Sequence, residues 1–149
     1  MAATEKNKNK PVRVLKFLNN GIYPGHILFS VGYNLKEIHD KLIKMKYTDY
    51  AEGIREKTWT PTSVGTAFSV ELIDHNTKDE CELFYIILKK FEFTDFDYCI
   101  LAHEITHMCQ FYFKSTCINR NNEIESEAHY HTHLMKQCLQ IMRDNHVSQ

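Results

Sequence analysis

The pattern of hydrophobic and polar positions predicts four short segments to be strands. Residues 12–18 and 26–33 are rich in β-forming residues and are separated by turn dipeptides, which predicts two strands. Residues 66–73 alternate between apolar and polar positions, whereas residues 83–88 form a continuous apolar run that suits a strand covered on both faces. The polar segment 75–80 is expected to join these two strands as a hairpin.

Helical spacing organises the other hydrophobic segments. Asn34 is a candidate N-cap with Glu37 three residues later, and apolar residues then recur at helical spacing, which predicts a helix of about three turns. Residues 47–63 are expected to form a loop with one helical turn. Two long helices are predicted over about residues 95–113 and 123–144. This order indicates an α+β fold, with a small N-terminal β-sheet and helix followed by a helical pair.

Length and composition fit one domain. The chain has 149 residues, 43% of them hydrophobic and 25% charged, and a formal net charge of -1. We expect a single domain over residues 11–149 behind a disordered tail over residues 1–10. The charge gives no electrostatic footprint for nucleic acid, so no DNA or RNA partner is expected. Without a membrane-spanning stretch or a secretory signal, a cytoplasmic protein with no membrane partner is predicted.

The segment His103-Glu104-Ile105-Thr106-His107 matches the HExxH pattern of zinc hydrolases. On an α-helix, residues four apart lie one above the other, so both imidazoles can reach one ion. Glu104 lies close to the same face and is expected to act as the general base toward a zinc-activated water. The alternative is a pair of core histidines satisfied by hydrogen bonds.

The helix around this motif has apolar residues on two sides. They lie in line with the histidines and on the opposite face: Phe96, Ile100 and Phe111, and then Leu101, Ile105, Met108 and Tyr112. We therefore expect this helix to be buried nearly all round.

A catalytic zinc site needs a third protein ligand, which the last helix is expected to supply. With Asn122 as N-cap, its inward stripe is predicted to hold Ile124, Ala128, His131, Met135, Cys138 and Met142. At about 100° per residue, Glu127 lies roughly 60° from Ile124, closer than Glu123 or Glu125. Glu127 is thus the expected ligand and Glu123 the alternative, while Glu125 is interpreted as a first-turn charge favoured by the helix dipole.

Two neighbours of Glu127 are candidate catalytic residues. His131 follows one turn later and almost on the stripe, which suits a partner of the ligands or a donor to the transition state. A core histidine at the helix interface is the alternative for His131. Tyr130 is a further candidate oxyanion donor.

The sequence resembles the zincin metallopeptidases. Ile100-Leu101-Ala102 and Met108-Cys109 match the uncharged flanks typical of that group around the motif. The string Ser126-Glu127-Ala128-His129-Tyr130 is similar to the gluzincin branch, in which a second helix supplies a glutamate ligand. The order of HEITH, a polar loop and ESEAHYH is similar to small predicted metallopeptidases of phages and mobile elements.

Some positions of the sequence differ from the patterns of the two zincin branches. Gln110 and Phe113 stand where the metzincin branch has a glycine and a third histidine, so that branch is not indicated. His131 stands where gluzincins often have an acidic residue.

The resemblance implies a minimal zincin-like domain that binds Zn²⁺ and cleaves a peptide or protein substrate. It also implies a substrate-binding edge strand within residues 64–91 and, for a phage-encoded protein, a location in the host cytoplasm. A non-catalytic binding protein that keeps the zinc site as a scaffold is the alternative function.

Overall fold

The computed structural model describes residues 11–19, 26–55, 64–73, 80–115 and 124–148. Within these ranges lies one sheet of four strands: β1 (Val14–Leu18), β2 (Ile27–Val31), β3 (Gly65–Ile73) and β4 (Glu80–Leu88). The helices are α2 (Leu35–Lys44), α3 (Thr48–Arg55), α4 (Asp95–Ser115) and α5 (Ile124–Ser148). The predicted α+β fold is confirmed, and the expected tail over residues 1–10 lies outside the described ranges. None of the described helices is long and apolar enough to cross a membrane.

The strand order is β1-β2-β4-β3. The predicted pairing of the last two strands is confirmed, because β3 and β4 are antiparallel with Gly65 opposite Leu88 and Ile73 opposite Glu80. β1 and β2 are also antiparallel, whereas β2 and β4 are parallel. This parallel pair places β2 and β4 in the centre of the sheet and leaves β1 and β3 at its two edges.

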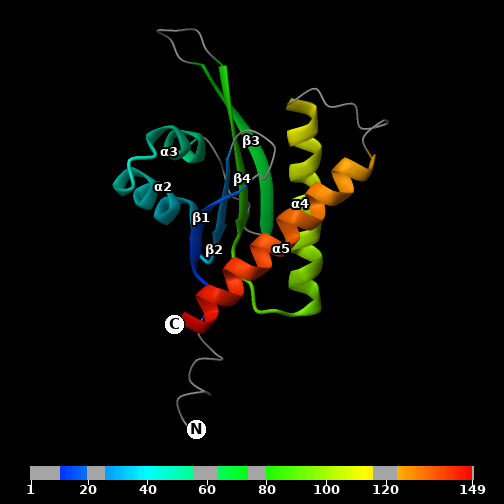
Figure 1. The fold of residues 1–149 in the computed structure, drawn as a ribbon. Helices are drawn as coiled ribbons and strands as arrows, with labels where there is room; N and C mark the ends of the chain where they lie inside the picture. The colour runs from blue at the N-terminus through cyan, green and yellow to red at the C-terminus, as the bar shows by residue number, and fades with distance from the viewer. Residues whose placement is uncertain (1–10, 20–25, 56–63, 74–79, 116–123, 149) are drawn as a thin grey trace, which may run out of the picture.

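Helices cover both faces of the sheet, with α2 and α3 on one side and α4 and α5 on the other (Figure 1). Central strand residues therefore alternate between two apolar clusters. Toward α2 and α3 lie Leu28, Tyr85 and Ile87 with Ile38, Leu42, Ala51 and Ile54. Toward α4 and α5 lie Ile27, Phe29, Phe84 and Ile86 with Leu101, Ile105, Met108 and Leu134. The continuous apolar run of β4 is thus buried on both faces, as predicted.

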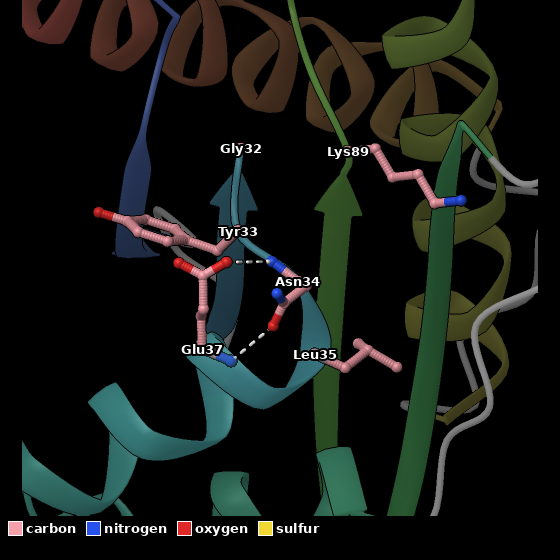
Figure 2. A pocket seen from close by; sticks show the side chains of 6 residues that line it. All are labelled: Gly32, Tyr33, Asn34, Leu35, Glu37 and Lys89. Atoms are coloured by element: carbon pink, nitrogen blue, oxygen red, sulfur yellow. Dashed lines mark hydrogen bonds between the residues drawn. The ribbon is translucent and has the colours of Figure 1, made fainter. Parts of the chain in front are cut away.

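The start of α2 confirms the predicted capping box. The Asn34 side chain accepts the N–H of Glu37 at 2.8 Å, and the Glu37 carboxylate accepts the N–H of Asn34 at 3.3 Å (Figure 2). After α2, the predicted loop with a single helical turn is wrong in part, because α3 extends from Thr48 to Arg55. Its Ala51 and Ile54 are buried under the sheet, so tertiary packing supports a longer helix than the mixed sequence suggested.

Helix α4 begins at a second capping box. The Thr94 hydroxyl oxygen accepts the N–H of Asp97 at 3.2 Å, while the buried Asp97 carboxylate accepts the N–H groups of Thr94 and Glu92 at 3.3 and 2.8 Å. These bonds satisfy donors that no helical carbonyl can reach. They define where α4 starts and therefore the level at which the HExxH segment lies.

The expectation that α4 is buried nearly all round is wrong. Its face toward the sheet is fully buried through Leu101, Ile105, Met108 and Tyr112. The histidine ridge is open instead, since His103 is exposed and Phe96 is 62% exposed. The sheet covers one side of α4 and α5 lies beside it, so no described layer covers the remaining side.

The inward stripe of α5 also differs from the prediction. Tyr130, Leu134, Cys138 and Met142 are buried, whereas Ala128 is exposed and His131 is only half-buried. The second half of α5 lies against β1, where the Asn19 carbonyl accepts bonds from His133 at 2.7 Å and Gln137 at 3.2 Å. This contact with β1 rotates the buried face relative to the one that apolar spacing predicted.

Replacing Asp97 with Ala is expected to lower the free energy of unfolding by about 1–2 kcal/mol, because the start of α4 loses the acceptor of two backbone N–H groups. Urea denaturation of the purified protein measures this change. Asp95→Ala is the matched control, since Asp95 is an exposed acid in the same first turn. Equal losses in the two variants would contradict the assigned role of Asp97.

Candidate metal centre

The two histidines of the HExxH segment point at a common position beside α4. Their Nε2 atoms lie 3.0 Å apart, and the ring planes are nearly perpendicular at 87°. His103 is exposed and His107 is half-buried. Two imidazole nitrogens therefore meet on the open ridge of the helix, as the four-residue spacing predicted.

The Gln110 side chain contacts the imidazole of His107 at its ring nitrogen Nδ1. Its side-chain oxygen lies 3.3 Å from His107 Nδ1, so the Nδ1–H donates to Gln110 and Nε2 presents its lone pair. A ring nitrogen oriented through its partner nitrogen is typical of histidine ligands. In the sequence Gln110 stands out only as the residue in place of the metzincin glycine, although its three-residue spacing from His107 is a signal that could have identified this contact.

Glu104 occupies the side of α4 that faces β3 and is only 8% exposed. The backbone N–H of Ala67 donates a hydrogen bond to the Glu104 carboxylate. Gly65 lies close to this side of α4, since a β-carbon there would stand 2.8 Å from Leu88 Cδ2, 3.1 Å from Ile100 Cγ2 and in ordinary contact with the Glu104 side chain. The motif glutamate is thus held between its own helix and the edge strand.

Burial raises the pKa of the Glu104 carboxyl above its ordinary value. The nearby imidazoles of His103 and His107 and the Ala67 N–H act in the opposite direction, because each stabilises the carboxylate. Desolvation outweighs these effects. A carboxylate with a raised pKa accepts a proton more readily than an exposed one, which suits a general base.

His131 brings α5 against the motif. Its Nε2 lies 3.2 Å from the Thr106 hydroxyl oxygen and 3.3 Å from the Ala102 carbonyl oxygen. Thr106 donates its own hydroxyl proton to Ala102 at 2.8 Å, so the His131 Nε2–H has two acceptors here. The contact lies on the ridge of α4 next to the histidine pair.

Tyr130 and Glu127 take different positions on α5. Tyr130 is 2% exposed, with its ring 5.2 Å from that of Tyr112 and 5.8 Å from that of Phe113, so it lies in the core. Glu127 is half-buried. Glu127 precedes Leu134 by two turns and lies roughly 20° from it around the helix. It is therefore closer to the observed buried face of α5 than to the inward stripe that the apolar spacing predicted.

A complete ligand set is not assembled among the described residues, where no three His, Cys, Asp or Glu side chains are grouped to hold a metal. Ligation by Glu127 therefore stays a prediction, and the alternative ligand Glu123 lies outside the described ranges. Glu125 is exposed and lies 3.9 Å from His129, as expected of a first-turn charge at the surface.

No protein-family model matches the sequence, and no curated protein or solved structure is significantly similar to it.

The raised pKa of Glu104 predicts a pH-dependent effect of Glu104→Gln on stability. The folded state binds this proton more tightly than the unfolded chain, so the parent protein loses stability as the pH rises through the raised folded pKa. Glutamine does not titrate. With metal removed by a chelator, the gain in urea midpoint of the variant over the parent should be larger at about pH 7 than at about pH 4.

Glu125→Gln, at an exposed position on α5, is the control for this measurement. A difference between Glu104→Gln and the parent that stays constant, or that shrinks as the pH rises, would contradict the assigned effect of burial.

Proposed function

We propose that this chain is a zinc-dependent metallohydrolase that cleaves peptide bonds. In this proposal His103, His107 and Glu127 bind the metal and Glu104 is the general base. The observation that carries it is the meeting of the His103 and His107 Nε2 atoms at 3.0 Å beside a buried glutamate. Core histidines would instead be enclosed, whereas this pair lies on an open ridge.

The donor set suits zinc. Two nitrogens bound to one tetrahedral zinc at 2.0–2.1 Å would be separated by roughly 3.3 Å. The observed 3.0 Å differs from this by a few tenths of an ångström, which small ring rotations can absorb. Gln110 supports the fit because it already accepts the other N–H of His107.

Glu127 is the third ligand in this proposal. It lies one turn before His131, whose imidazole binds α4 at Ala102 and Thr106, on the ridge next to the histidines. Glu127 is half-buried and lies near the inward face of α5. Completion of the ligand set requires its carboxylate to turn toward the pair.

A bound zinc ion would supply a Lewis acid that polarises the scissile carbonyl and makes water a stronger nucleophile at neutral pH. The remaining chemistry belongs to Glu104. Its desolvated carboxylate takes the proton from the attacking water and returns it to the leaving amine. The Ala67 N–H holds this carboxylate in place on the β3 side.

The proposed substrate class, peptides, is inferred from the position of β3 beside Glu104. β3 is an edge strand of the sheet, and its backbone at Ala67 lies next to Glu104. An extended peptide can add to a strand edge through main-chain hydrogen bonds, which would place its backbone along the catalytic ridge. This position of β3 agrees with the edge strand that the zincin resemblance implied within residues 64–91.

We assign His131 first to holding α5 against α4, since its Nε2 is engaged by Ala102 and Thr106. Its role as a transition-state donor stays a prediction. Tyr130 contributes to the aromatic core between the two helices, and its predicted role as an oxyanion donor is likewise untested.

Metal content tests the ligand set. Protein purified without added zinc is expected to contain about one zinc per chain, and His103→Ala or His107→Ala should abolish it, because a three-ligand site loses a ligand. Glu127→Ala should weaken zinc binding in a chelator competition far more than Glu125→Ala, its exposed control. Normal zinc content in both histidine variants, or the reverse order of the two glutamates, would refute the assignment.

Glu104→Gln tests catalysis separately from metal binding. Glutamine keeps the shape of the side chain but removes its basicity, so zinc occupancy and the fold should survive while peptide hydrolysis falls by at least ~10²-fold. A quenched-peptide library measures the rates, and metal analysis checks the occupancy. Undiminished cleavage by the variant would disprove the role of Glu104, and loss of zinc would show that Glu104 is a ligand or a structural residue.

Zinc-loaded parent protein that cleaves no member of a broad peptide library would favour the alternative of a non-catalytic binding protein with the same metal site.

A further inference from the structure

Two hollows lie on either side of Tyr33, at the end of the sheet where β2 and β4 lead into the following segments. One, of about 390 Å³, is lined by Gly32, Tyr33, Asn34, Leu35, Glu37 and Lys89 (Figure 2). Its polar groups at the start of α2 are used by the capping box. The second hollow lies between β1 and the later half of α2, and its lining is strongly basic.

Four cationic side chains surround the second hollow, which has a volume of about 360 Å³. Lys16 lies in β1 and Arg13 directly precedes this strand, whereas Lys41 and Lys44 come from the last turn of α2. Tyr33 forms part of the wall, with the Arg13 guanidinium 4.5 Å and the Lys41 ammonium 5.0 Å from its ring centroid. The aromatic ring thus holds two of the cations close to each other.

Negative charge near these cations is limited. The Glu37 carboxylate pairs with Arg13 at 2.6 Å, but no acidic residue lines the hollow itself. Attraction to the C-terminal end of α2 accounts for Lys41 and Lys44, yet it does not explain why Arg13 and Lys16, at the start of the β1 segment, lie on the same side. The surplus of positive charge is therefore a property of the assembled surface.

The wider sequence has the same asymmetry. Residues 11–46 contain six Lys and Arg against two Asp and Glu, whereas residues 47–149 contain nine against sixteen. A concave surface of one sign raises the local concentration of counter-ions. The hollow thus attracts anions although the whole chain has a net charge of -1.

We propose that this hollow, formed by Arg13, Lys16, Tyr33, Lys41, Lys44 and Asn145, binds a small molecule or headgroup bearing phosphate. Three lysines, together with an Arg13 that is shared with Glu37, match a ligand with several negative charges better than a single carboxylate. The cluster is too compact for a nucleic-acid duplex, whose binding faces cover an area of about 1,000 Å² or more. It lies at the β1 edge of the sheet, opposite the edge strand β3 beside the histidine pair, so it is a separate site.

Inorganic pyrophosphate is the first probe, added to the purified, chelator-treated protein of residues 1–149 while backbone amide shifts are recorded by NMR. Saturable shifts are expected to gather around residues 13–16 and 41–45, with a dissociation constant of about 1 mM or lower. Lys16→Gln and Lys41→Gln should each weaken binding about tenfold, because each removes a charge-assisted contact. Lys36→Gln is the control, since Lys36 is exposed on α2 but does not line the hollow.

The proposal is overturned if no saturable shifts occur at these residues, if the shifts centre on residues 103–107, or if Lys36→Gln weakens binding as much as Lys16→Gln. Vesicles bearing a phosphomonoester lipid give a second arm. Vesicle binding that needs Lys16 and Lys41 would identify a headgroup as the source of the phosphate, whereas pyrophosphate binding alone would identify a free ligand. Much tighter binding of single-stranded DNA, with equal loss in all three lysine variants, would replace the proposed site by a general polyanion surface.

Discussion

Packing of one apolar face of α4 against the sheet determines where the side chains of the HExxH segment lie. Leu101, Ile105 and Met108 fill the interior beneath the helix, so the histidines must occupy its outer ridge. This arrangement gives the imidazoles access from outside while the helix stays rigidly supported. Ligands on a packed helix are held more accurately than ligands on a loop, which is the property that a catalytic metal site requires.

The same packing gives the Glu104 carboxyl and the imidazoles of His103 and His107 different surroundings. Gly65 allows β3 to approach α4 closely, and the resulting contact removes most of the Glu104 side chain from water. His103 stays exposed only one residue away. A single helical turn therefore combines a desolvated carboxylate, whose pKa is raised, with a pair of accessible nitrogen donors.

Helix α5 connects the motif helix α4 to the β1 edge of the sheet. It contacts the motif helix through His131, and from His133 onward it binds the residues that flank β1, Asn19 through His133 and Gln137 and Arg13 through Asn145. The rotation imposed by β1 also sets the position of Glu127, since a rigid helix turns as one body. α5 thus contacts the HExxH helix near one end and contributes Asn145 to the basic hollow at the other.

Local patterns in the sequence determined the helix and strand types, the Asn34–Glu37 capping box and the juxtaposition of His103 with His107. These features depend on residues at most four positions apart, whose relation is set by helix geometry. The parallel pairing of β2 with β4, the open histidine ridge and the buried face of α5 were decided by the tertiary structure. Each depends on which surfaces meet across long separations in the chain, and the burial of Glu104 by Gly65 and Ala67 leaves no periodic signal around Glu104 itself.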